Sequence, residues 1–356
     1  MALKIDDAWL WDFWIADDGT SYHLFYLHAP RSLVDPELRH RNATIGHAVS
    51  VDLTNWQVIG EVLAAGADGD FDATATWTGS VVRDDAGQWR MFYTGSVFYP
   101  THNIETIGYA VSDNLYDWQK VPGPAVKADP RWYEVYGDST WPEEAWRDPW
   151  VFKDPSGAGW HMLVTARANS GPVDDRGVIG HATSTDLESW TVHPPLSQPG
   201  AGFGHLEVPQ LVTVEGRHLL LFSCASPALA GARKPSSGGV WALEGAELVG
   251  PYPVENASLV TSAPLYSARL AQTRTGAWVM LAFDTEKADG VFPGSISIRS
   301  LSLLAWTGVW NCSMCRTLVI SPPLLHATTN CRRQAPAPES SRHGVSLKPD
   351  TGTVPT

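Results

Sequence analysis

The sequence IGHAVSVDLTNW at residues 45–56 returns twice along the chain, as IGYAVSDNLYDW at 107–118 and as IGHATSTDLESW at 179–190. Each copy begins with an apolar stretch typical of a β-strand. It continues into a turn that contains Asp or Asn and ends at a Trp that opens another strand. A sequence that recurs at long intervals indicates a fold assembled from repeated structural units.

A second repeat interleaves with the first. Its copies are short apolar, aromatic-rich stretches that follow Asp- or Gly-containing turns, at residues 22–26, 89–93 and 160–164, with weaker copies at 218–222 and 278–282. Each copy predicts a β-hairpin. Five hairpins predict an all-β fold, a five-bladed β-propeller with a central active-site funnel. Sandwiches and jelly rolls are also built from short strands, but they have no reason to repeat a sequence.

The hairpins occupy residues 1–298, which we expect to form one catalytic propeller domain. Residues 299–356 contain six basic and two acidic residues and match neither repeat. We expect this segment to be an atypical tail, disordered from about residue 334, where Pro, Ser and Thr dominate. No complete C-terminal β-sandwich is expected. A shift of reading frame would produce the same abrupt change in composition.

The composition restricts the classes of partner. The net charge of −13 disfavours nucleic acid and anionic membranes as partners, and no apolar run is long enough for a membrane-spanning helix. The first residues include acids where a signal peptide needs an apolar core, so a cytoplasmic location is expected, with secretion not excluded. We predict no cofactor and no metal site. Structural calcium and the oligomeric state are left open.

Three carboxylates, Asp12, Asp148 and Glu207, lie at similar points shortly before three of the hairpin repeats. In equivalent blades they would converge on the central cavity. Converging carboxylates shift one another's pKa values, as acid/base and nucleophilic work on a glycosidic bond requires. Each could instead be a solvated or paired structural acid. Because Glu207 sits in an apolar run where an unpaired charge is costly, we favour a functional role. The predicted partner is a small-molecule sugar.

The segments around these acids resemble the β-fructosidase group of glycoside hydrolases, families 32 and 68 and more distantly family 43. Trp11-Asp12-Phe13-Trp14 is similar to the family 68 segment that carries the nucleophile. Arg147-Asp148-Pro149 matches the Arg-Asp-Pro motif, and Glu207-Val208-Pro209 is similar to the segment with the acid/base. Trp77-Thr78-Gly79-Ser80 resembles the segment that lines the fructosyl subsite. The resemblance implies a five-bladed propeller with three acids in a funnel.

The implied roles agree with the chemistry of the residues. Asp12 would attack the anomeric carbon, Asp148 would stabilise the transition state, and Glu207 would protonate the leaving oxygen. We expect Asp12 and Asp148 to raise the pKa of Glu207. A retaining enzyme would hold the Asp12 and Glu207 carboxyls about 5–5.5 Å apart. The expected substrate-binding residues are Trp11, Trp14, Trp77, Ser80 and Arg147.

The leading interpretation is a retaining β-fructofuranosidase that acts on sucrose or short fructo-oligosaccharides, with transfructosylation as a further possibility and the balance between hydrolysis and transfer left open. An arabinofuranosidase or β-xylosidase of the family 43 type is the first alternative, with Asp12 as general base and an inverted product. A carbohydrate-binding propeller without catalysis is the second. Three acids in equivalent positions favour catalysis, because a lectin needs no nucleophile and acid together.

Overall fold

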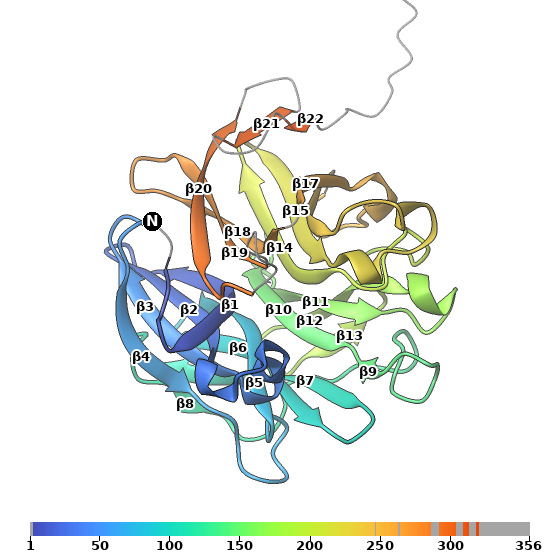
Figure 1. The fold of residues 1–356 in the computed structure, drawn as a ribbon, viewed down its shortest axis with the longest axis horizontal. Coiled ribbons are helices and arrows are strands. Elements are labelled where there is room, and N and C mark those ends of the chain that lie inside the picture. The colour runs from blue at the N-terminus through green and yellow to red at the C-terminus, as the bar shows by residue number, and fades with distance from the viewer. Residues whose placement is uncertain are drawn as a thin grey trace, which may run out of the picture. The chain divides into compact units, whose positions relative to one another are not determined.

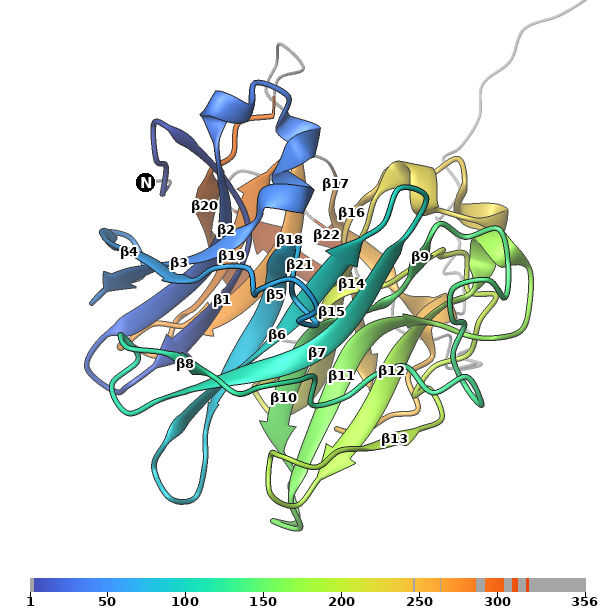
Figure 2. The ribbon, with the colours of Figure 1, turned by 90° about the horizontal axis from the view of Figure 1, so that it is seen from below.

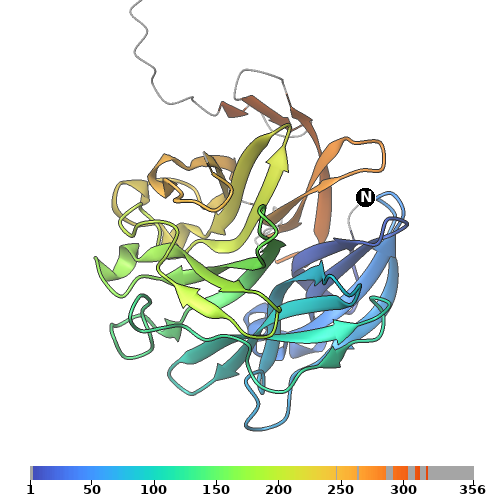
Figure 3. The same ribbon diagram turned by 180° about the vertical axis from the view of Figure 1, so that it is seen from behind.

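The computed structural model describes residues 3–245, 247–262, 264–285, 292–303, 309–312 and 318–319. Within these residues the chain forms five antiparallel sheets around a common axis (Figure 1). Figure 3 shows the same sheets from the opposite side. The prediction of an all-β, five-bladed propeller is confirmed. A C-terminal sandwich is not tested, because everything after residue 319 lies outside the described residues.

Each blade consists of strands that are consecutive in the chain. The first blade comprises β1 (Ala8–Asp17), β2 (Tyr22–Pro30), β3 (Thr44–Ser50) and β4 (Gln57–Leu63). The second comprises β5 (Ala75–Arg83), β6 (Trp89–Phe98), β7 (Asn103–Ser112) and β8 (Gln119–Lys120), with β9 (Glu143–Glu144) parallel to β7. The third comprises β10 (Trp146–Lys153), β11 (Trp160–Arg167), β12 (Gly177–Ser184) and β13 (Thr191–His193).

The fourth blade comprises β14 (Glu207–Val214), β15 (Arg217–Cys224), β16 (Gly239–Gly245) and β17 (Ser258–Ser262). The fifth comprises β18 (Leu265–Gln272), β19 (Trp278–Asp284), β20 (Ile296–Leu303), β21 (Val309–Cys312) and β22 (Leu318–Val319). The hairpin repeat supplies the second strand of every blade. The longer repeat supplies the third strand of the first three blades, as its apolar stretch and turn predict.

Short 3-10 helices stand on the connections between strands. They are η1 (Arg31–Leu33), η2 (Pro36–Asn42), η3 (Val173–Asp175), η4 (Ser226–Ala228), η5 (Gly231–Arg233) and η6 (Val254–Asn256). Figure 2 shows the η1–η2 segment, in blue, and the η4–η5 segment, in yellow, at the same end of the propeller. None of the helices among the described residues is long and apolar enough to cross a membrane.

Every innermost strand carries a β-bulge. The register slips between Leu10 and Phe13, Trp77 and Gly79, Arg147 and Trp150, Glu207 and Gln210, and Tyr266 and Arg269. A bulge bends a strand and redirects its side chains. The three acids therefore do not occupy one identical position, as the sequence repeat suggested. Glu207 precedes its bulge, Asp148 is the first bulged residue and Asp12 is the second.

The first strand of the chain closes the ring against the last blade. Leu3 exchanges two backbone hydrogen bonds with Ile296 of β20, at 2.8 and 3.0 Å, and Leu10 donates to the carbonyl of Gly294 at 3.2 Å. Gly294 has a positive φ of 59°, and a Cβ there would lie 2.7 Å from the Cα of Trp9. Only glycine therefore permits this approach.

The predicted division of the chain at residue 298 stays a prediction, and that position falls inside β20. The segment predicted to be disordered, from about residue 334, lies outside the described residues.

Two blades contain a buried pair of histidines linked to a turn aspartate. His161 Nδ1 lies 2.9 Å from His181 Nε2, and His161 Nε2 lies 2.6 Å from Asp154. The first blade repeats the arrangement with His23, His47 and Asp18. In the second blade Arg90 and Tyr109 take the equivalent places, with Arg90 bonded to Asp84 at 3.1 Å. In each of these three blades, a side chain of the second strand therefore stacks against one of the third strand, and different residue pairs supply the contact.

Burial lowers the pKa of His47 and of His181 to about 3, because a charged imidazole loses its hydration there and the neighbouring histidines oppose a second charge. An unfolded chain binds these protons below about pH 6.5. The contribution to stability is therefore complete above that pH and is lost progressively as the pH falls towards 3.

We expect the free energy of unfolding to decrease between about pH 7 and about pH 4. The double variant His161→Arg/His181→Tyr installs the pair found in the second blade and should lose less stability over this range. Chemical denaturation followed by tryptophan fluorescence measures both slopes. Equal slopes in the parent and the variant would contradict the assignment.

Candidate active site

The three predicted acids meet at a cavity of about 730 Å³ at the end of the propeller that carries η2 and η4. Asp12, Asp148 and Glu207 all line it, together with Trp11, Trp77 and Arg147, as predicted. The remaining lining comes mainly from loops and strand ends of the first, fourth and fifth blades, including Pro36, Glu37, Arg39, His40, Ser226, Tyr266, Phe283 and Phe292. Six of the eight site residues predicted from the sequence thus line one cavity.

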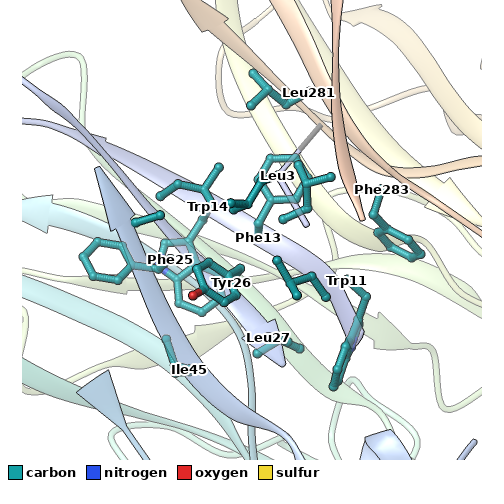
Figure 4. Close-up of a cluster of buried hydrophobic side chains, with 14 of the residues drawn as sticks. Leu3, Trp11, Phe13, Trp14, Phe25, Tyr26, Leu27, Ile45, Leu281 and Phe283 are labelled. Atoms are coloured by element: carbon teal, nitrogen blue, oxygen red, sulfur yellow. The ribbon is translucent and has the colours of Figure 1, made fainter. Parts of the chain in front are cut away.

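Trp14 and Ser80 do not line the cavity, which corrects the sequence-based prediction. The Trp14 side chain is fully buried and stacks against Phe25 in the core of the first blade, on the other side of β1 from Trp11 (Figure 4). Side chains alternate along a strand, so nearness in sequence to Asp12 did not place Trp14 at the cavity. The Ser80 hydroxyl accepts a hydrogen bond from the backbone of Val151 at 3.0 Å and joins two blades.

Asp12 is held by two hydroxyl groups from neighbouring blades. Thr78 donates to one carboxylate oxygen at 2.7 Å, and Ser267 donates to the other at 2.6 Å. Burial and the negative charges of Asp148 and Glu207 together raise the pKa of Asp12 to about 6, against the lowering effect of the two hydroxyls. The sequence repeat did not single out Thr78 or Ser267. Aligning the five inner strands on their bulges would have found Ser267.

Asp148 serves the fold as well as the cavity. Its backbone has a positive φ of 58° at the bulge, and its amide donates to Thr94 at 2.9 Å. The carboxylate accepts hydrogen bonds from the Thr165 hydroxyl at 2.8 Å and from the backbone of Val208 at 3.0 Å. Burial raises the pKa of Asp148, although Arg147 opposes the rise.

Glu207 lies in a different environment from the one predicted. Arg147 donates to its carboxylate at 2.8 Å, the Tyr266 hydroxyl donates to the other oxygen, and His205 Nε2 lies 3.3 Å away. Burial alone would raise its pKa, but the charges of His205 and Arg147 and these hydrogen bonds hold it well below the usual value. The prediction of a raised pKa for Glu207 is wrong for the unliganded cavity, because cationic neighbours outweigh the two aspartates.

Arg147 is shared among several carboxylates. Beyond Glu207, it donates to Glu105 at 3.0 Å and to Glu143 at 3.1 Å, and its Nε lies 3.6 Å from Asp148. Glu105 has no exposed surface, and burial raises its pKa to about 8, so it carries a proton at neutral pH. The sequence signal for Glu105 was an acid in an apolar third strand, which the repeat alignment did not weigh.

The described residues include no cluster of three or more His, Cys, Asp or Glu side chains that could hold a metal ion. Two buried carboxyls with opposite pKa shifts face one cavity, an arrangement suited to nucleophilic and acid/base work on a bond between sugars.

Replacing His205 with Asn should raise the pKa of Glu207, because a neighbouring charge and a hydrogen bond are lost together. Carbon-13 NMR of the glutamate carboxyls during a pH titration measures the change. His218→Asn, on the exposed part of β15, is the matched control and should leave Glu207 unaffected. An unchanged titration in His205→Asn would show that Arg147 and Tyr266 alone set the pKa.

Residues 14–246 match the glycosyl hydrolases family 32 N-terminal domain. Raffinose invertase of Escherichia coli is 29% identical over 243 residues, which cover 63% of this chain and 45% of that protein. Acid beta-fructofuranosidase 1, vacuolar, of a Rosa hybrid cultivar is 30% identical over 154 residues, 42% of this chain and 23% of that protein. The chain thus spans less than half the length of either relative.

Two solved structures share the fold. The inulosucrase from Halalkalicoccus jeotgali bound to kestose has a TM-score of 0.72 at 21% identity, covering 90% of this chain and 92% of that one. The Microbacterium saccharophilum K-1 beta-fructofuranosidase catalytic domain has a TM-score of 0.69 at 16% identity, covering 86% and 80%. The family match includes Asp148 and Glu207 and begins two residues after Asp12. The match contains the second and third blades and most of the first and fourth, so this chain belongs to the glycosyl hydrolases of family 32.

Proposed function

We propose that this protein cleaves terminal fructofuranosyl units from sucrose or short fructo-oligosaccharides, with retention of configuration through a fructosyl-enzyme. The observation that carries the proposal is the Asp12 carboxylate, fixed by the Thr78 and Ser267 hydroxyls at the same cavity as Glu207 and Asp148. The names of the two relatives, an invertase and a beta-fructofuranosidase, support fructose as the transferred sugar. The partner is thus a small-molecule sugar.

In the proposed reaction, the Asp12 carboxylate forms a bond to the anomeric carbon of fructose as the bond to the leaving oxygen breaks. Glu207 gives its proton to that oxygen and later takes one from water. Asp148 accepts hydrogen bonds from sugar hydroxyls, a role for which its second oxygen is available beside the one bonded to Thr165 and Val208. Trp11 and Trp77 offer flat apolar walls to the sugar rings.

Transfer to a second sugar uses the same intermediate. A fructosyl-enzyme reacts with water or with any hydroxyl placed over Asp12, so hydrolysis and transfructosylation differ only in what occupies the outer part of the cavity. Phe283 and Phe292 add aromatic surface there. The likeness of fold to an inulosucrase bound to kestose supports including transfer in the proposal.

Incubation with sucrose should release glucose and fructose, measured by chromatography over time. Asp12→Asn should lower the rate by at least about 10³-fold, because no nucleophile remains. Asp113→Asn, an exposed acid on the second blade, is the matched control. Glucose in excess of fructose would indicate transfer. Absence of release by protein with a native circular dichroism spectrum, or full activity in Asp12→Asn, would overturn the proposal.

The pH profile tests how the pair shares its proton. Turnover requires one proton on the pair, on Glu207, with Asp12 ionised. In the free protein that proton resides on Asp12, whose pKa is about 6. We expect kcat/KM to fall as the pH rises above about 6, when the pair loses it.

Ser267→Ala removes a hydrogen bond that lowers the pKa of Asp12. The substitution should therefore move the alkaline limb of the kcat/KM profile to higher pH. It should also reduce the maximum of kcat/KM, because the proton then favours Asp12 still more. A limb that stays in place, or moves downwards, would contradict the assignment of this limb to Asp12.

A further inference from the structure

The described lining of the cavity contains more acids than cations. Its cations are Arg39 and Arg147, and its acids are Asp12, Glu37, Asp148 and Glu207. His40 also lines the cavity, but burial, followed by the charge of Arg39, lowers its pKa to about 4, so it is neutral at pH 7. The cavity therefore offers a bound molecule no excess of positive charge.

Arg147 cannot serve an anionic substrate, because its donors are already engaged. It bonds to Glu207 at 2.8 Å, Glu105 at 3.0 Å and Glu143 at 3.1 Å, with 5% of its surface exposed. A phosphate group that approached Arg147 would have to displace a carboxylate that this cation keeps ionised. It would also face Asp12 and Asp148.

Arg39 is the cation of the outer wall, and Glu37 neutralises it. Its guanidinium donates to the Glu37 carboxylate at 2.8 Å and to the Pro36 carbonyl at 2.8 Å. It also lies over the rings of Phe292, at 4.4 Å, and Trp11, at 5.7 Å. The Trp77 indole donates to the carbonyl of His40 at 2.8 Å and anchors the helical turn that carries both charges. The aromatic rings and the carboxylate thus hold Arg39 in one place with its charge compensated.

We propose that this cavity selects uncharged sugars and excludes a disaccharide that carries a phosphate, and that the Glu37–Arg39 pair is the part of the wall that enforces the selection. The proposal rests on the fructosyl-cleaving function proposed above and names its substrate class. A neutral sugar meets aromatic faces and paired charges. A phosphate dianion meets an excess of acids, and bringing like charges together is unfavourable in a partly desolvated site.

The test compares sucrose with sucrose 6-phosphate as substrates of the parent protein. We expect kcat/KM to favour sucrose by about 100-fold or more, which is about 2.8 kcal/mol at 1.4 kcal/mol for each factor of ten. Glu37→Gln leaves the charge of Arg39 uncompensated and should reduce the ratio of the two kcat/KM values about fivefold. The effect is limited to this size because water partly screens the charge of the exposed Glu37. Glu244→Gln removes a comparable exposed partner, that of Arg217, on the outer part of the fourth blade, and should leave the preference unchanged.

The dependence on salt separates charge from shape. Raising the ionic strength from about 0.02 M to about 0.5 M shortens the screening length and should narrow the preference, whereas exclusion by size would not respond. A preference that is insensitive to both salt and Glu37→Gln would overturn the role of this pair. Equal or faster cleavage of sucrose 6-phosphate would overturn the selection while leaving the fructosyl-cleaving function intact.

Binding measurements keep the two proposals distinguishable. If folded protein cleaves neither sugar, the proposed function fails, and calorimetric titration with sucrose and with sucrose 6-phosphate still decides the selection. Tighter binding of sucrose supports it. Tighter binding of the phosphorylated sugar, or binding of neither, overturns it.

Discussion

The bulge in each innermost strand is the constraint on which the cavity depends, because the amide it frees must find a partner outside its own sheet. In three successive blades that partner comes from the preceding blade. The Asp148 amide donates to Thr94, the Val208 amide to Asp148, and the Ser267 amide to Ser223. These bonds fix neighbouring blades against each other at the depth where the acids lie. The same residues that close the propeller around its axis therefore set the positions of the reacting groups.

Arg147 imposes a second constraint, because the four carboxylates around its guanidinium and nearby Asp12 cannot all be ionised in a buried site. The pKa values of these carboxyls are therefore shifted in different directions. Glu207 and Glu143 are influenced by His205 as well as by Arg147 and keep depressed pKa values, while burial raises those of Asp12, Asp148 and Glu105. Glu105 is the most deeply enclosed and holds its proton most firmly. The pKa values around the cavity thus follow from the burial of each carboxylate and from the cations near it, and sequence position alone does not reveal either.

Much of the fold follows from the sequence, because repeats report the periodic part of the structure. The three copies of the longer repeat place β3, β7 and β12, and the turns before the shorter repeat place the five hairpins. The acids followed from their place beside those hairpins. A sequence repeat does not reveal a one-residue shift in the register between two strands. Asp12, Asp148 and Glu207 lie at three different offsets from their bulges, and Thr78 and Ser267 of the neighbouring inner strands bind Asp12. Such contacts between blades depend on local backbone geometry, which single-sequence patterns do not encode.

The location of the shared proton shows how the fold and the chemistry are linked. Asp12 receives only neutral hydroxyl donors, whereas Glu207 receives a guanidinium, an imidazole and a phenol. Charged donors stabilise an ionised carboxylate more strongly than neutral ones do, so the empty cavity keeps the proton on Asp12. A sugar that fills the cavity removes water from both carboxyls and places its leaving oxygen as a proton acceptor beside Glu207. The proton must then move to Glu207 before Asp12 can attack. The difference between the pKa values of Asp12 and Glu207 therefore sets the fraction of complexes that are ready to react. Arg147 binds Glu207 and holds its pKa down, so it also limits that fraction.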